Sequence, residues 1–107
     1  LVPLLAAGAL KVSQDPGEVT VTAGDGVALG CCVLANEPWD LLRMEWVKDA
    51  GHKVLCATRL HPATPLPCSN CTPRLCLAWH PPCATLSLHQ VHGDDAGNYL
   101  CWVTLEI

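Results

Sequence analysis

Cysteine is the residue type in this chain with the widest choice of chemistry. Eight of its 107 residues are cysteines, about 7%, which approaches the share found in small domains cross-linked by disulfides. They stand at Cys31, Cys32, Cys56, Cys68, Cys71, Cys76, Cys83 and Cys101. Cysteines in such number either pair in an oxidising compartment or hold a metal in a reducing one, so the compartment decides between these chemistries.

Two features predict that the chain is exported. Leu1–Ala9 is apolar and ends in Ala7-Gly8-Ala9, which fits the small-residue pattern before a signal-peptide cleavage site. We expect residues 1–9 to be the remainder of a signal peptide and residues 10–107 to be the domain, the alternative being a hydrophobic first strand. Asn70-Cys71-Thr72 is an Asn-x-Thr acceptor, which makes Asn70 a candidate for glycosylation. Both features favour an oxidising compartment, in which the cysteines pair.

A metal site is the competing interpretation of the cysteines. Cys68-x-x-Cys71 with Cys76 nearby resembles part of a zinc site. No second pair stands at ligand spacing, and an exported chain is in the wrong compartment for zinc held by thiolates. A redox Cys-x-x-Cys pair would need a βαβ context that the sequence does not offer. We therefore expect no metal and no cofactor.

Catalysis has equally little support. The chain has neither a glycine-rich phosphate loop nor a His-Glu-x-x-His motif, and its five histidines stand at no ligand spacing. The serines have no evident base beside them, so no catalytic residue is predicted. A net charge of −4 without a basic cluster argues against nucleic-acid binding. No apolar run reaches the ~18 residues of a membrane span.

The elements that position the cysteines are predicted to be short strands. Proline and glycine total 17 residues and interrupt the chain throughout. Between them, apolar and polar residues alternate with period two, which is typical of half-buried strands. We expect strands at 18–22, 27–33, 42–46, 54–56, 74–79, 85–91 and 98–107, and an irregular loop or edge at 57–73. Short strands at near-regular spacing predict an all-β sandwich.

One set of residues indicates which type of β-sandwich this is. Trp46 follows Cys31 by 15 residues, and Cys101 ends a segment in which Tyr99 stands two residues earlier. This Cys…Trp…Cys order with its tyrosine resembles the variable-type domains of the immunoglobulin superfamily. A Cys31–Cys101 disulfide would then join the two sheets, with Trp46 packed against it. The Tyr99 hydroxyl would bond to backbone near the preceding turn, where Gly97 allows an unusual backbone angle.

The same resemblance implies a salt bridge. Arg74 precedes Asp95 by 21 residues, as in variable domains, where such a pair closes the bottom of the sandwich. Variable domains end in a strand G that follows strand F. Because the chain stops at Ile107, at the predicted end of strand F, we expect an incomplete immunoglobulin-like sandwich of the variable type that lacks its last strand.

Strand parity predicts a second disulfide. Cys32 points outward because Cys31 points inward, and Cys83 points outward because Leu86 points inward. The two strands are antiparallel neighbours in the resembled fold, so we expect Cys32 to pair with Cys83. Cys56 is expected to hold the following loop through Cys68 or Cys71. The pairing stays open among Cys56, Cys68, Cys71 and Cys76.

Outward residues on two strands form a candidate interface. If Tyr99 and Cys101 point inward, then Leu100, Trp102 and Thr104 point outward. Trp46 points inward in the same sheet, so its neighbours Glu45 and Val47 also point outward. An exposed tryptophan on a flat sheet favours a protein interface. These five outward residues are the predicted ligand-binding set.

The segments 42–49 and 97–107, together with Cys56, resemble the ectodomains of lymphocyte costimulatory receptors of the immunoglobulin superfamily. The resemblance implies a type I plasma-membrane protein, anchored by a span beyond Ile107 and carrying a tyrosine-containing tail. It would bind an immunoglobulin-family ligand on another cell through the sheet of strands F and C, and costimulate T or NK lymphocytes. The alternative is a secreted or adhesive domain, including a disulfide-linked homodimer.

Overall fold

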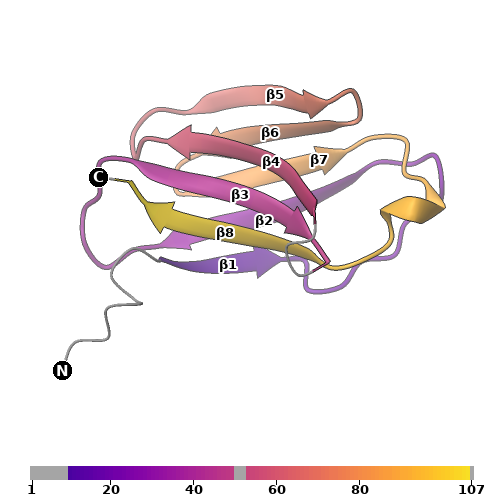
Figure 1. The fold of residues 1–107 in the computed structure, drawn as a ribbon, viewed down its shortest axis with the longest axis horizontal. Coiled ribbons are helices and arrows are strands. Elements are labelled where there is room, and N and C mark those ends of the chain that lie inside the picture. The colour runs from indigo at the N-terminus through magenta and orange to yellow at the C-terminus, as the bar shows by residue number, and fades with distance from the viewer. Residues whose placement is uncertain (1–9, 50–52, 107) are drawn as a thin grey trace.

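Two antiparallel sheets pack face to face in the computed structural model, which describes residues 10–49 and 53–106 (Figure 1). The five-stranded sheet has the order β1-β2-β7-β6-β5, and the three-stranded sheet has the order β4-β3-β8. The expected signal-peptide remainder at 1–9 and the terminal Ile107 lie outside the described residues. Within those residues, no helix has the length and apolar character needed to cross a bilayer.

The strands are short, as the interruptions by proline and glycine predict. The five-stranded sheet consists of β1 (Lys11–Asp15), β2 (Val27–Leu34), β5 (Leu66–Thr72), β6 (Leu75–His80) and β7 (Cys83–Leu88). The three-stranded sheet consists of β3 (Leu42–Lys48), β4 (Lys53–Leu60) and β8 (Tyr99–Leu105). A 3-10 turn at Gly93–Asp95 joins β7 to β8.

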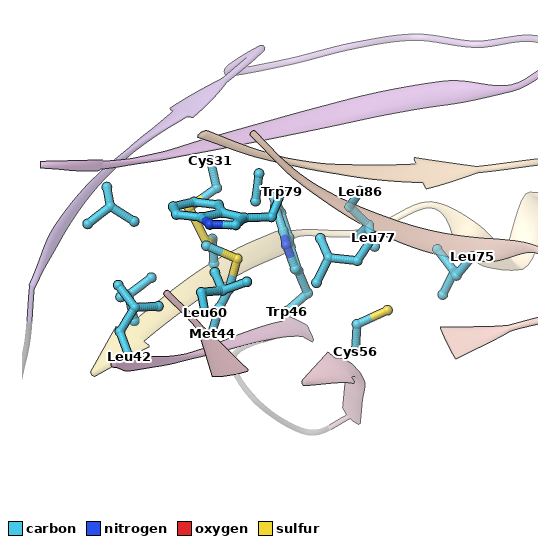
Figure 2. Close-up of a cluster of buried hydrophobic side chains, with 14 of the residues drawn as sticks. Cys31, Leu42, Met44, Trp46, Cys56, Leu60, Leu75, Leu77, Trp79 and Leu86 are labelled. Carbon is cyan, nitrogen blue, oxygen red and sulfur yellow. A yellow bond between two sulfur atoms is a disulfide. The ribbon is translucent and has the colours of Figure 1, made fainter. Parts of the chain in front are cut away.

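The core lies between the sheets and follows the alternation in the sequence. Leu42, Met44 and Trp46 point inward from β3 and are completely buried. Opposite them, β2 and β7 contribute alternate residues such as Cys31 and Leu86 to the same cluster (Figure 2). Period-two patterns place every second side chain in the core because successive residues of a strand face opposite sides. The inward faces that the sequence predicts for these strands are confirmed.

The prediction of a strand at 18–22 is wrong. This segment pairs with no strand among the described residues, whereas β1, a strand that the sequence analysis did not predict, pairs with β2 from Lys11↔Leu34 to Asp15↔Gly30. Val21 packs against the core, while Val19 is 51% exposed. The alternation therefore predicts which side chains are buried, but it does not predict whether the backbone is hydrogen-bonded to a neighbouring strand.

The chain between 57 and 73 is more regular than expected. β4 continues to Leu60, and β5 occupies 66–72 as an edge strand that is exposed along almost its whole length. Such a polar strand has little apolar burial of its own. Two disulfides hold it instead: Cys68–Cys76 joins β5 to β6, and Cys56–Cys71 joins β5 to β4 in the other sheet. The bond from Cys56 confirms the expectation that Cys56 holds this segment, and it selects Cys71 of the two expected partners.

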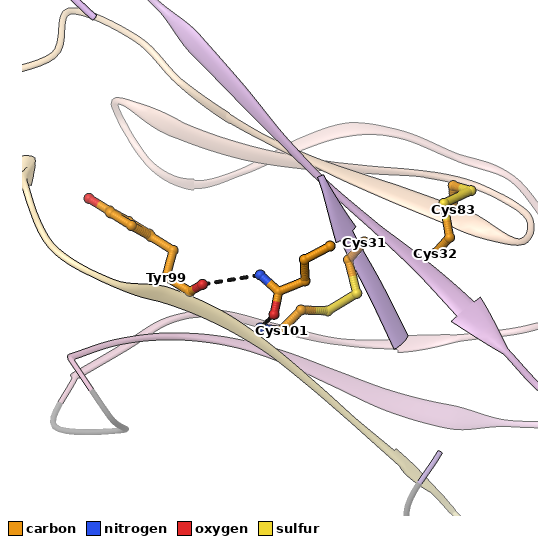
Figure 3. Close-up of a disulfide and its surroundings, with 6 residues drawn as sticks. Cys31, Cys32, Cys83, Tyr99 and Cys101 are labelled. Atoms are coloured by element: carbon orange, nitrogen blue, oxygen red, sulfur yellow. Dashed lines mark hydrogen bonds between the residues drawn. A yellow bond between two sulfur atoms is a disulfide. The ribbon is translucent and has the colours of Figure 1, made fainter. Parts of the chain in front are cut away.

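All eight cysteines are paired within the chain. Cys31–Cys101 joins β2 to β8 and so crosses between the sheets (Figure 3). Cys32–Cys83 joins neighbouring strands at directly opposed positions, as strand parity predicts. No cysteine is free. A disulfide-linked dimer would therefore require one of these four bonds to open.

Candidate ligand-binding face

A network of polar contacts fixes the turn that leads into β8. The Arg74 guanidinium donates to both carboxylate oxygens of Asp95, at 2.9 and 3.1 Å. The same carboxylate accepts the backbone N–H of His92 at 2.7 Å. The Tyr99 hydroxyl donates to the Asp95 carbonyl. The residues that the immunoglobulin resemblance assigns to the salt bridge and the tyrosine corner are thus brought together at one end of the sandwich.

The ion pair shifts the acidity of its members. The hydrogen bond from Arg74 lowers the pKa of Asp95 from its ordinary 3.8 to about 2, against the opposing effect of burial. The same bond raises the pKa of Arg74. A carboxylate with a lowered pKa in the folded state contributes stability above about pH 4, and this contribution is lost as the pH falls towards 2.

Replacing Asp95 by asparagine should therefore make the free energy of unfolding depend less on pH in the acidic range. At pH 7 we expect Asp95→Asn to lower the free energy of unfolding by about 1–2 kcal/mol, because it removes a paired, hydrogen-bonded charge. Between pH 4 and 2 the wild type should lose more stability than the variant. Thermal unfolding followed at several pH values measures both effects. Asp94→Asn is the matched control, and an equal acid response of the two variants would contradict the assignment.

Gly97 is favoured by the backbone angle at the same turn, where flexible side-chain ends also approach closely. Its φ is +153°, and a Cβ there would lie 2.8 Å from Asp49 Oδ1 and 2.9 Å from Lys48 Cε. The Asp49 carboxylate accepts the backbone N–H of Asn98 at 3.3 Å. The Lys48 ammonium donates to the Asp94 carbonyl. The end of β3 therefore meets the start of β8, which fixes the register between the two strands.

That register sets the outer face of the three-stranded sheet. Glu45 lies opposite Trp102, and Val47 lies opposite Leu100. Trp102 is 58% exposed and Leu100 is 40% exposed. Both belong to the predicted ligand-binding set, and the structure places them two residues apart on the outer side of β8. Thr104 follows them, also exposed, so that β8 presents an unbroken outward row.

Val47 differs from the expectation. It is only 6% exposed although it lies outside the core cluster, so it faces the outer side but is covered there. Its neighbours in the register are Leu100 on β8 and Val54 on β4, and Val54 is 54% exposed. Val47 thus forms the floor of the face rather than its surface.

The sequence does not predict that Val54 lies on the outer face, for an identifiable reason. The pairing of β3 with β4 shifts between Trp46 and Val47, where the register skips Leu55. An extra residue in one strand reverses the parity beyond it. Val54 shares the parity of the inward Cys56 and would be expected to point inward, but the bulge turns it outward. No pattern in the sequence marks this position.

The face has an apolar part and a charged part. Trp102, Leu100 and Val54, which we call the apolar patch, are exposed over Val47. Beside them, Arg43 Nε contacts Glu45 Oε1 at 3.1 Å. Arg59 and Glu106 form a second surface ion pair at 3.0 Å. Apolar anchors beside a polar margin are the composition expected of a protein interface.

Both margins of the sandwich are only partly closed. At one margin a groove of about 910 Å³ opens between 14–21 and 91–99, and the Gln14 amide bridges it. This amide donates to the Tyr99 carbonyl at 3.1 Å and accepts from the Cys101 N–H at 3.0 Å (Figure 3). At the other margin a cleft of about 420 Å³ separates β4 from β5 beneath Cys56–Cys71, with Asn70 at its wall.

Known proteins share this fold without sharing the sequence. No family model and no curated protein matches the chain. A strand-swapped CTLA-4 from duckbill platypus matches with a TM-score of 0.64 and 22% identity, covering 91% of this chain and 79% of that one. A chain of the structure that describes T-cell specificity and activation by the bacterial superantigen toxic shock syndrome toxin-1 matches with a TM-score of 0.67 and 19% identity, covering 92% and 84%. The fold is an immunoglobulin-like β-sandwich.

Proposed function

We propose that this chain is the ectodomain of a cell-surface immune receptor, which binds an immunoglobulin-family ligand on another cell and costimulates T or NK lymphocytes. The observation that carries the proposal is the apolar patch on the outer face of the three-stranded sheet. The segments 42–49 and 97–107 resemble the ectodomain of transmembrane and immunoglobulin domain-containing protein two. The likeness in fold to CTLA-4 supports the same class of receptor.

The patch has the physical character of a binding site. A tryptophan that keeps more than half of its surface in water leaves a large apolar area unburied, which a partner can cover. Tryptophan is enriched among the few residues that contribute most of the binding energy of an interface. The neighbouring Arg43–Glu45 pair offers both signs of charge at the margin of the patch. A flat sheet of this composition fits a second flat sheet better than it fits a small molecule.

An extracellular position at the plasma membrane completes the proposal. Four disulfides in a chain of this size are stable in an oxidising compartment. Asn70 is exposed on β5, which belongs to the five-stranded sheet. A glycan attached there would start at the margin between β5 and β4 and not on β8, which carries Trp102 and Leu100. The membrane anchor would lie in a segment outside this chain.

Replacing Trp102 by alanine should abolish most of the binding to ligand-bearing cells. Loss of a central aromatic anchor costs about 2 kcal/mol or more, which corresponds to roughly 30-fold weaker affinity. Fluorescent tetramers of the domain, titrated on antigen-presenting and tissue cells, measure this change. Leu34→Ala is the control, because Leu34 is 53% exposed on β2 in the other sheet. Equal staining by the two variants, or no staining of any cell type by the wild type, would contradict the proposal.

A further inference from the structure

The four disulfides differ in how far solvent reaches their cysteines. Cys31 and Cys101, in the bond that crosses the core, are 0% and 3% exposed. Cys32 and Cys83, on neighbouring strands of the five-stranded sheet, are both half-buried (Figure 3). Thiol–disulfide exchange requires a thiolate to reach one sulfur of the bond, so its rate depends on this access. A thiol in solution therefore has least access to Cys31–Cys101 and partial access to Cys32–Cys83.

The two bonds that hold β5 each present one exposed cysteine. In Cys56–Cys71, Cys71 is exposed on β5, whereas Cys56 is buried on β4. In Cys68–Cys76, Cys68 is exposed on β5, whereas Cys76 is buried on β6. A thiolate from solution therefore attacks the cysteine on β5, and the buried cysteine is the leaving group. Exposed disulfides are the ones that exchange with thiols most readily.

β5 has few other contacts that keep it in place. It is the last strand of its sheet and pairs with β6 on one side. Among its seven residues Leu66 is half-buried, and the other six are exposed. Its register with β6 shifts twice, once before Ser69 and once after Asn70. Little apolar burial and an interrupted ladder are typical of segments that open locally at low free energy. The attachment of β5 therefore depends on its two disulfides.

We propose that the two disulfides of β5 are a thiol-exchange site, at which an extracellular dithiol oxidoreductase releases β5 from both sheets while the core disulfide stays closed. The inference rests on the extracellular position in the proposed function and not on the ligand proposed there. Its substrate class is a dithiol, because each bond needs two electrons and two protons to open.

The exchange proceeds in two steps at each bond. A thiolate of the oxidoreductase attacks Cys71 Sγ and forms a mixed disulfide, and Cys56 leaves as a thiolate that takes up a proton. The second thiol of the oxidoreductase loses its proton and attacks the mixed disulfide, which frees Cys71 as a thiolate that is then protonated. The domain gains two thiols, and the oxidoreductase gains one disulfide. The same sequence at Cys68 frees Cys76.

Release of β5 changes the surface of the domain at the cleft between β4 and β5. Leu66 lies opposite Trp79 in the register, and both residues line this cleft together with Leu60 and Leu77. Leu60, Leu77 and Trp79 are buried while β5 is in place. When β5 leaves with Leu66, part of their apolar surface meets solvent. Cys31–Cys101 still joins the two sheets, so the change is local and reoxidation reverses it.

Differential alkylation measures the order in which the bonds open. The oxidised domain is incubated with reduced thioredoxin as the dithiol probe, quenched with iodoacetamide, and analysed by peptide mass spectrometry. The four cysteines of the β5 bonds should be alkylated about tenfold or more faster than Cys32 and Cys83. Cys31 and Cys101 should stay unmodified. Simultaneous alkylation of all eight cysteines would mean that exchange proceeds through global unfolding, and would overturn the proposal. Earlier opening of Cys32–Cys83, or no reduction of any bond, would overturn it equally.

Amide exchange tests whether β5 detaches. In the selectively reduced and alkylated protein, the amides of β5 should lose their protection, while those of β2 and β7 should keep it. A variant with serine at Cys56, Cys68, Cys71 and Cys76 should reproduce this pattern without a reductant. Cys32→Ser with Cys83→Ser is the control, in which β5 should stay protected. Protection of β5 that persists after reduction would overturn the release. Neither measurement uses cells or a ligand, so both are independent of the Trp102 test.

Discussion

Replacing Cys31 and Cys101 together by alanine should leave the domain largely unfolded at 37 °C. The bond closes a loop of 70 residues, and in the chain-entropy description a loop of this length stabilises the folded state by about 4 kcal/mol. Both sulfurs lie in the core beside Trp46, which stands opposite Cys101 in the register, so their removal also leaves a cavity. A loss of this size is comparable with the whole stability of a small domain.

The Cys32–Cys83 bond supplies the matched comparison. It spans 51 residues along the chain, but with Cys31–Cys101 in place the shortest covalent path between its ends is only about 20 residues. Both cysteines are half-buried and lie outside the core cluster. Cys32→Ala with Cys83→Ala should therefore destabilise clearly less in urea or thermal unfolding. Equal losses of unfolding free energy in the two double variants would show that the disulfide through the core stabilises the domain no more than Cys32–Cys83 does.

Removing Trp79 should have the second largest effect. Its indole is buried, donates its N–H to the His61 carbonyl at 2.9 Å, and lies 6.3 Å from the Trp39 ring at a tilt of 52°. Trp79→Ala is expected to lower the free energy of unfolding by about 3–5 kcal/mol, as for other large-to-small changes in cores. Urea unfolding, followed by the fluorescence of the remaining tryptophans, measures the loss.

Phenylalanine substitutions separate the ring from its polar atom. Trp79→Phe removes the hydrogen bond to the His61 carbonyl, which is worth about 0.5–1.5 kcal/mol because His61 is exposed and water can replace the donor, and it also loses packing. The buried Trp46 Nε1 has no hydrogen-bond partner among the described residues, so Trp46→Phe removes a group that is already unsatisfied. Figure 2 shows the two rings in one cluster. We expect Trp46→Phe to be the milder change, and the reverse order would refute this account.

The central part of the fold could be predicted because it depends on local parity. Alternation on 27–33 and 42–46 gives the inward faces, and the opposed parity of Cys32 and Cys83 gives their pairing. The partner of Cys56 could be narrowed to Cys68 or Cys71 but not chosen between them, since that choice depends on how β4 and β5 meet across a margin of the sandwich. The failure at 18–22 has the same origin. A segment can bury one side chain without a neighbouring strand, and sequence patterns report only the burial.

The candidate face was predictable on β8 and less so beyond it. Trp102 and Leu100 follow from the inward cysteine between them, because β8 is regular throughout. Val47 and Val54 depend on the register with β4, which shifts at Leu55. A one-residue irregularity exchanges the two faces of a strand. The ligand-binding role of the face stays a prediction that the Trp102 variant tests.

The Cys31–Cys101 bond also determines how the domain bears mechanical load. A pull on Leu10 and Glu106 passes along β1 to Cys31, crosses the sulfurs, and leaves through β8. The other three disulfides all lie within the bridged loop and never enter this path. With the bond intact, only the short segments outside the loop can be drawn out, to about 90 Å, whereas the reduced chain would extend to roughly 330 Å. The oxidised domain therefore reaches only about a quarter of the extension of the reduced chain before the load falls on covalent bonds.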